Sequence, residues 1–152
     1  MNLTPRIPTA PTPAETVVIH MIEAVNQRDF DALDDLIAPD LVRHCAATPE
    51  IEVRSLEQFK EFLHRDLAAV PDSEQEVNLI FSKGPLVAAH VTYRGTQEGP
   101  MGPFPPSGKK LEIPFVGILR VEEGKIAEIW VEWDNLNALM QIGHFPPEPV
   151  TD

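Results

Sequence analysis

KKLEIPFVGILRVEEGKIAEIWVEWDNLNALMQIG, residues 109–143, is the stretch that decides the fold class. Residues 111–121 and 125–133 alternate apolar and polar side chains at a period of two, which is typical of β-strands. Glu123 and Gly124 form a turn between them, and Asp134 is a good N-cap for a short helix. We therefore expect an antiparallel hairpin that leads directly into a helix.

The two predicted strands of this hairpin each have one apolar face and one mixed face. In the second strand, Trp130, Glu132 and Asp134 share the mixed face, whereas Ile129 and Trp133 lie on the apolar one. A site placed on the mixed face would combine an aromatic ring with two carboxylates.

Two arrangements of these faces are open. In the first, helices cover the apolar face and the mixed face lies against solvent. In the second, helices cover the mixed face around a cavity, and a second subunit covers the apolar face. Val116, Ile118 and Trp130 favour the second arrangement, because a solvent-exposed face seldom carries so much apolar area. That arrangement requires a homodimer.

The chain before this hairpin contains further helices and strands. Helical spacing of apolar residues and N-capping signals predict helices over residues 12–29, 29–37 and 55–70. Period-two alternation predicts two more strands, over residues 74–82 and 86–95. Helices gathered against an antiparallel sheet of about four strands make an α+β fold. Pro114 interrupts a predicted strand, which indicates a sheet edge or a bulge.

Composition limits the classes of partner. The 152 residues suit one domain, and we divide them into a flexible Pro-rich arm (1–12), a folded domain (13–144) and a C-terminal tail (145–152). A net charge of −12 argues against nucleic acid, which attracts clustered Lys and Arg, and no apolar run is long enough for a membrane span. The single Cys45 and the absence of a readable secretory signal predict a cytoplasmic protein.

Three segments carry a family resemblance: RVEEGKIAEIWVEWDNLNALMQIG (120–143), GTQEGPMGPFPPSGKK (95–110) and PDLVRHCA (39–46). Together they resemble the SnoaL-like polyketide cyclase, or ester cyclase, family, and the resemblance extends from about Glu15 to Gly143. It implies a cystatin-like α+β cone, in which a curved antiparallel sheet wraps the N-terminal helices and leaves an apolar internal pocket. It also implies a homodimer through the outer face of the sheet.

The resemblance further implies an intramolecular aldol cyclisation of a polyketide ester, with no cofactor and no metal. On that basis the acid/base aspartate is Asp134, and Glu132 is a second carboxylate that would share a proton with it. His90 is a candidate second acid/base group. Each residue has a structural alternative: Asp134 as a helix cap, Glu132 as an ion-pair partner of Arg94 or Arg120, and His90 as a cross-strand partner.

We expect five residues to contact the substrate. Because the family often keeps a histidine near the cavity mouth, His44 is one of them; the others are Trp130, Ile118, Arg120 and Phe104. The chain also departs from the family pattern. Gln97 stands where the loop usually has a histidine, and Ile118 and Arg120 stand where active cyclases carry polar or histidine partners for the aspartate.

Two other functions fit the same fold. One is a binding protein that holds an apolar ligand without turnover. The other is a related enzyme, either an isomerase that needs a buried tyrosine opposite its base or an epoxide hydrolase with an Asp-Arg-Asp set. Tyr93 is the one tyrosine of the sequence, and Arg94 or Arg120 would have to serve beside Asp134.

Overall fold

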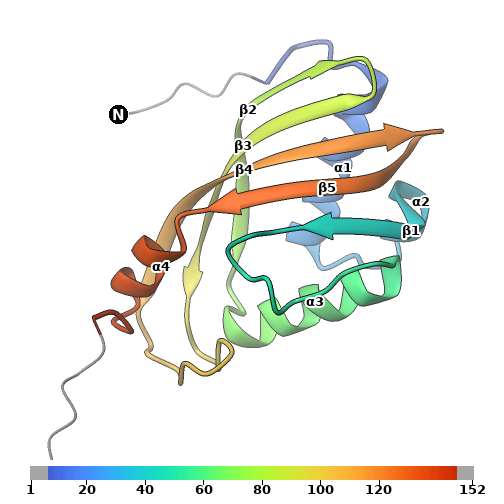
Figure 1. Ribbon diagram of the computed structural model, residues 1–152. Helices are drawn as coiled ribbons and strands as arrows, with labels where there is room; N and C mark the ends of the chain where they lie inside the picture. Colours follow the sequence, from blue (N-terminus) through green and yellow to red (C-terminus); the bar gives the residue numbers. More distant parts are fainter. Residues whose placement is uncertain (1–6, 147–152) are drawn as a thin grey trace, which may run out of the picture.

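A computed structural model describes residues 7–146, which form one curved, open five-stranded sheet with four helices (Figure 1). The strands are β1 (Ile37–His44), β2 (Glu74–Lys83), β3 (Leu86–Thr96), β4 (Lys110–Glu122) and β5 (Lys125–Trp133). The helices are α1 (Pro13–Gln27), α2 (Leu33–Leu36), α3 (Leu56–Ala69) and α4 (Asn135–Gln141). The predicted α+β cystatin-like cone is confirmed.

The helix starts follow from capping residues. Thr12 and Glu15 form a reciprocal capping box at α1, with Pro13 at the first helical position. At α3, the Ser55 hydroxyl accepts a hydrogen bond from the Gln58 backbone, while the Gln58 side chain accepts one from the backbone of Arg54 rather than of Ser55. Both N-terminal boundaries were therefore predictable from short sequence signals.

The sheet has the order β1-β5-β4-β3-β2, and all neighbours are antiparallel except β1 and β5, which are parallel. In the β4–β5 hairpin, Glu123 and Gly124 have φ of 50° and 77°, as a two-residue primed turn requires. The fifth strand, β1, was not predicted. Its first residue, Ile37, is the last residue of the helix predicted over residues 29–37, but α2 ends at Leu36 and Pro39 lies within the strand.

Pro114 does not lie on an edge strand, because β4 pairs with β3 over residues 110–120 and with β5 over residues 115–122. Its position is nevertheless edge-like. Pairing with β5 ends at Phe115 and Trp133, so at Pro114 the strand has only β3 as a neighbour. A proline that donates no backbone hydrogen bond is tolerated at such a site.

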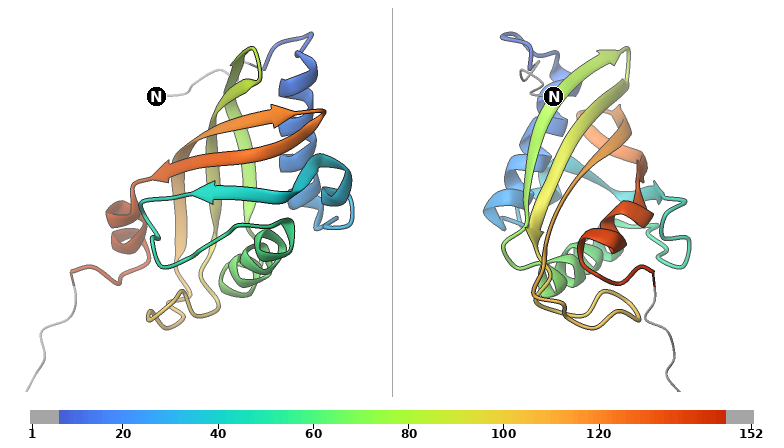
Figure 2. Two further views of the ribbon diagram at one scale, coloured as in Figure 1. Left: turned by 45° about the vertical axis from the view of Figure 1, so that its right-hand side comes forward. Right: turned by 90° about the vertical axis from the view of Figure 1, so that its left-hand side faces the viewer.

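The apolar face of the sheet is the inner face. Figure 2 shows α1 and α3 against the concave side of the strands, and the core includes Val91, Ile113 and Leu119 from that side. The opposite, mixed face is open in this chain, where Val116 is 48% and Ile118 43% exposed. The helices therefore cover the apolar face, as in the first of the two arrangements, and the prediction that they cover the mixed face is wrong.

The terminal predictions fall partly outside the described residues. Of the predicted arm, residues 1–6 lie outside them, and of the predicted C-terminal tail, residues 147–152 do. In the part of the chain that is described, no helix has both the length and the apolar character needed to span a membrane.

Candidate active site

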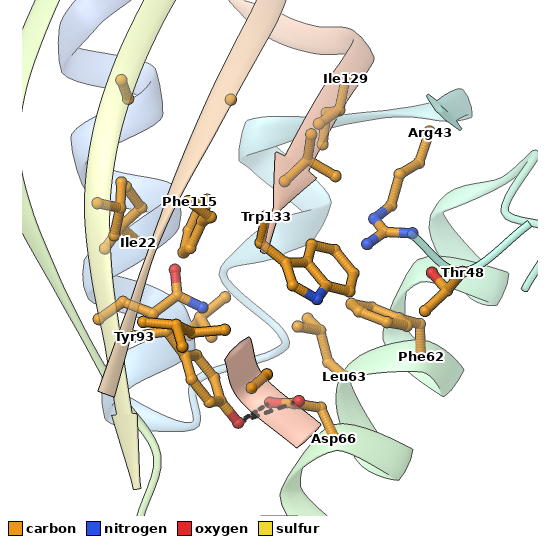
Figure 3. A pocket seen from close by; sticks show the side chains of 18 of the residues that line it. Ile22, Arg43, Thr48, Phe62, Leu63, Asp66, Tyr93, Phe115, Ile129 and Trp133 are labelled. Atoms are coloured by element: carbon orange, nitrogen blue, oxygen red, sulfur yellow. Dashed lines mark hydrogen bonds between the residues drawn. The ribbon is translucent and has the colours of Figure 1, made fainter. Parts of the chain in front are cut away.

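An apolar cavity of about 230 Å³ lies between the concave face of the sheet and the helices (Figure 3). Side chains from β3, β4 and β5 form one wall, and α1, α3 and α4 contribute most of the rest. Arg43 of β1, Gln75 of β2, Thr48 and Met101 complete the lining. Its lining is mostly aliphatic and aromatic, and the charged residues that border it are Arg43 and Asp66. A mainly apolar cavity with few polar groups is the usual form of a small-molecule site.

Asp66 enters the cavity from α3. Phe59, Phe62 and Leu63 occupy the same face of the helix, since residues three, four and seven positions apart lie above one another. The Tyr93 hydroxyl, from β3, donates to both oxygens of the Asp66 carboxylate, at 3.1 and 3.2 Å. Helix and sheet thus bring together an acid and a phenol that are 27 residues apart.

Burial shifts the acidity of this pair. The loss of solvation raises the pKa of Asp66 from 3.8 to about 6, although the Tyr93 hydrogen bond and the charges of Arg28 and Arg43 act in the opposite direction. Burial and the neighbouring Asp66 also raise the pKa of Tyr93, so the phenol stays protonated as a donor. A carboxyl with a pKa close to neutral can accept a proton and return it.

Arg43 reaches the cavity from β1, where its backbone is paired with Ile129 of β5. Its guanidinium carbon lies 4.3 Å from the ring centre of Phe62 and 5.9 Å from that of Trp133. Such distances are typical of cation–π contacts. Arg43 and Asp66 therefore place one positive and one acidic group against the same apolar space.

The predicted carboxylates lie elsewhere. Asp134 is exposed, and its Oδ1 accepts the Asn137 backbone N–H at 2.9 Å as the N-cap of α4, the structural alternative. Glu132 is exposed on the outer face and accepts the Ala46 N–H at 3.3 Å. Neither residue borders the cavity, so their predicted placement in the pocket is wrong. The error follows from the assignment of the mixed face to the inside.

Most of the other predicted site residues meet on the outer face. His44 donates to Glu128 at 2.7 Å and stacks on Trp130, with ring centres 5.4 Å apart. Arg120 pairs with Glu128 at 3.4 Å. Ile118 is the cross-strand neighbour of Trp130. The structure brings these predicted residues together, but none of them borders the cavity.

His90 and Phe104 are also outside the cavity lining. On the outer face, His90 accepts a hydrogen bond from Asn78 at 3.1 Å, the cross-strand role left open above. Phe104 stacks on His144 at 5.1 Å in the loop between β3 and β4. Gln97 is fully buried there, donating to Gly99 and Pro105 and accepting from His144 at 2.9 Å. Gln97 thus fastens the loop, which contributes Met101 to the cavity wall.

The helical pattern of the sequence contains a signal for Asp66, whereas the alternation in the strands pointed to other carboxylates. Residues 55–70 form an apolar stripe, and Asp66 lies three positions after Leu63 and seven after Phe59, on the side of the helix that faces the sheet. An acid on the apolar face of a helix is a stronger site signal than an acid on a mixed strand face.

A family model for the SnoaL-like polyketide cyclases matches residues 15–142. The chain belongs to the SnoaL-like polyketide cyclase family. The resemblance inferred from the three sequence segments is thereby confirmed. No curated protein matches the chain significantly.

Solved structures similar to the chain include several members and relatives of this family. IdmH of Streptomyces antibioticus, described as a candidate polyketide cyclase, is 32% identical, with a TM-score of 0.76 over 88% of this chain and 99% of its own. AclR of Streptomyces galilaeus, a candidate hydroxylase, is 26% identical, with a TM-score of 0.75 over 88% and 97%. An LEH-like epoxide hydrolase of M. tuberculosis, 18% identical with a TM-score of 0.69 over 86% and 89%, shares the fold alone.

Residues 7–146 contain no group of three His, Cys, Asp or Glu side chains placed to bind one metal ion. The ionisable groups of the cavity are instead Asp66, Tyr93 and Arg43. Without further groups, these residues can move a proton between Asp66 and a bound molecule while Tyr93 and Arg43 donate hydrogen bonds.

Proposed function

We propose that the protein is an acid–base enzyme for an apolar, oxygenated small molecule, with Asp66 as its general base and Tyr93 as a hydrogen-bond donor beside it. Family membership supports the fold-level part of this proposal. The observation that carries the residue assignment is the Asp66–Tyr93 pair, which borders an apolar cavity and has a carboxyl pKa of about 6. No cofactor or metal takes part in the proposed step.

The proposed reaction is an intramolecular aldol cyclisation. The Asp66 carboxylate removes a proton from a carbon that lies between two carbonyl groups, which leaves an enolate. The enolate carbon attacks another carbonyl of the same molecule, so a carbon–carbon bond forms and the attacked oxygen becomes an alkoxide. The proton held by Asp66 then passes to that oxygen, which gives a hydroxyl and restores the carboxylate.

A proton-transfer isomerisation is the second candidate. Isomerases of this fold need a buried tyrosine near the base, and Tyr93 lies on the inner face in contact with Asp66. The same first step, proton removal beside a carbonyl, serves both reactions. In the isomerisation the proton returns to another carbon of the enolate, whereas in the cyclisation it passes to the new alkoxide oxygen. A binding protein without turnover would use the cavity but not the acidity of Asp66.

We also propose a homodimer through the outer face of the sheet. Phe81, Ala88, Ile118, Trp130 and His44 are successive cross-strand neighbours, so they form one row across all five strands. The outer patch is defined by the exposed apolar residues of this face: Leu79, Phe81, Leu86, Val116, Ile118 and Trp130. A contiguous apolar patch of this kind is typical of an interface. Cytoplasmic location and the domain limits stay predictions.

The test of the catalytic proposal is Asp66→Asn, which keeps the size of the side chain and removes the base. The measurement is hydrogen–deuterium exchange of the acidic C–H of a cyclic 1,3-diketone, followed by NMR in D₂O above the buffer rate. We expect the variant to lose at least about 100-fold, since general base catalysis contributes about that much or more.

The matched control is Asp134→Asn, the same substitution at the exposed cap of α4. Asn caps helices as well as Asp does, so the fold is retained. If Asp134→Asn removed the exchange activity and Asp66→Asn did not, the base would be Asp134 and the proposal would be wrong. A wild type without exchange activity on any 1,3-diketone would favour the binding protein.

A further inference from the structure

Two buried side-chain polar atoms at the cavity have no hydrogen-bond partner among the described residues. They are Nη1 of Arg43 and Oγ1 of Thr48, and both are buried. Arg43 as a whole is only 8% exposed. Both residues border the cavity, and Figure 3 shows them close together on one side of it. Buried polar atoms almost always have partners, so an unpartnered pair in one place needs a physical explanation.

The surroundings of Arg43 stabilise the cation only in part. Phe62 and Trp133 contact the guanidinium through their rings, the Cys45 side chain contributes a hydrogen bond, and Asp66 and Glu132 attract it by charge. The two carboxylates act on the guanidinium only through their charges, and Nη1 has no hydrogen-bond partner among the described residues. A buried guanidinium without a paired anion is costly, and proteins keep one chiefly where something else supplies the negative charge.

We propose that Arg43 and Thr48 form a subsite for a carboxylate of the ligand, on a different side of the cavity from Asp66 and Tyr93. Arginine presents parallel N–H groups that match the two oxygens of a carboxylate, and the Thr48 hydroxyl can donate one more hydrogen bond. The inference rests on the proposed function in taking this cavity as the substrate site.

Other ligand groups fit the subsite less well. A neutral ester or amide would accept hydrogen bonds but leave the buried charge of Arg43 uncompensated. A phosphate would bring up to two negative charges into a small cavity that already holds Asp66, in a chain with a net charge of −12. A single carboxylate on an apolar skeleton meets the charge, the geometry and the apolar lining together.

The subsite also gives the ligand an orientation. Phe62 and Leu63 line the space between Arg43 and Asp66, as Figure 3 shows. A ligand held at Arg43 by its carboxylate would lay its apolar part along these side chains and present its far end to Asp66 and Tyr93. The substrate class that follows is a free apolar acid with a ketone or enolisable carbon remote from the carboxylate, rather than an ester.

The test compares two ligands that differ in charge and little in shape, 2-naphthoate and 2-naphthamide, by calorimetric titration of the full chain. We expect the wild type to bind the naphthoate at least about 10-fold more tightly, since a charge-assisted hydrogen bond in a buried site is worth that or more. Arg43→Met should abolish the preference. Thr48→Val should weaken naphthoate binding by about 3- to 10-fold.

Arg54→Met is the matched control, because Arg54 is a surface arginine whose side chain is 70% exposed and pairs with Glu52. It should keep the wild-type preference. The proposal is overturned if the wild type binds neither probe, if it shows no preference, or if Arg43→Met retains the preference. Arg43→Gln repeats the test with a second neutral side chain should the methionine variant not fold.

Thermal unfolding without ligand separates a ligand subsite from a packing role. Removal of an unpaired buried cation should raise the Tm of Arg43→Met by a few degrees. A lower Tm together with an unchanged ligand preference would mean that Arg43 only packs against the two rings. Asp66→Asn in the same titration should keep the preference, so a failed subsite and a failed catalytic base give different results.

Discussion

The two faces of the sheet use the same strands but have different chemistry. The inner face carries aliphatic side chains that are nearly all buried, such as Val91 and Leu119, and few polar ones, among them Tyr93 of β3 and Arg43 of β1. The outer face carries charged pairs and the outer patch. A strand face that mixes polar and aromatic side chains is therefore a poor indicator of the candidate site, because in this sheet that mixture lies on the outer face.

Chemistry at the inner face depends on a few polar groups in an apolar space. Asp66 is one carboxyl among apolar side chains, and burial brings its pKa to about 6. Glu128, on the outer face, has several partners, and its hydrogen bonds to His44 and Arg120 lower its pKa. The pKa of a carboxyl group is thus shifted in opposite directions on the two faces. The loss of solvation raises it at Asp66, and hydrogen bonds lower it at Glu128.

The largest expected effect comes from a matched pair of substitutions that tests which face of the sheet is the inner one. Val91→Asp places a carboxyl on the inner face, at a residue 1% exposed, and we expect it to cost more than about 4 kcal/mol of unfolding free energy. Val116→Asp makes the same change at a residue 48% exposed, and we expect less than about 1 kcal/mol for the monomer. Urea unfolding at low protein concentration measures both.

Similar losses at the two positions would contradict the assignment of inner and outer faces. So would the reverse order, which the sequence-based placement of the mixed face toward the helices requires. The pair is informative because Val91 and Val116 lie on adjacent strands, one pairing step apart.

The sequence predicted most of the elements but not the direction in which the sheet faces. Period-two alternation located β2 to β5, and capping residues located α1, α3 and α4. Strand β1 was missed because it pairs in parallel with a strand about 90 residues later, and its Pro39 resembles a helix stop. Long-range pairing of this kind has no local signal.

The site was predictable only in part, for a related reason. Parity separates the two faces of a strand but does not say which one the helices cover. The exposed Trp130 and Ile118 made the mixed face look enclosed, and Asp134, Glu132 and His90 were assigned to the site with them. Asp66 and Arg43 come from a helix and from the unpredicted strand, so their meeting depends on tertiary packing.

The second prediction concerns the pH dependence of stability at the inner face. Burial raises the pKa of Asp66 to about 6 from 3.8, so the folded protein binds this proton more tightly than the unfolded chain. The resulting stabilisation is complete below pH 3.8 and is lost as the pH rises through about 6. The difference corresponds to up to about 3 kcal/mol.

Asp66→Asn removes this titration, so its unfolding free energy relative to the wild type should rise by up to about 3 kcal/mol between pH 4 and pH 7. Denaturant unfolding at several pH values measures it. Tyr93→Phe is the companion variant. It removes a hydrogen bond that lowers the pKa of Asp66, so the loss of stability should move to higher pH. A difference between wild type and Asp66→Asn that does not change with pH would mean that Asp66 is well solvated.

The smallest expected effect on the free energy of unfolding is at the outer face. There the informative quantity is the dissociation constant of the proposed dimer. Ile118→Lys introduces a charge at the centre of the row that runs from Phe81 to His44. If a second copy covers the outer patch, two such charges meet the interface, and the dimer dissociation constant should rise by at least about 100-fold. The unfolding free energy of the monomer should change by less than about 1 kcal/mol, because Ile118 is 43% exposed.

Sedimentation equilibrium separates the two quantities. Leu136→Lys is the matched control, since Leu136 is 51% exposed but lies on α4 rather than on the sheet, and it should leave the dimer intact. If the wild type is monomeric at every accessible concentration, a second copy does not cover the outer patch and the dimer proposal is wrong. The proposed ligand site would not be affected, since the residues that line the cavity all belong to one chain.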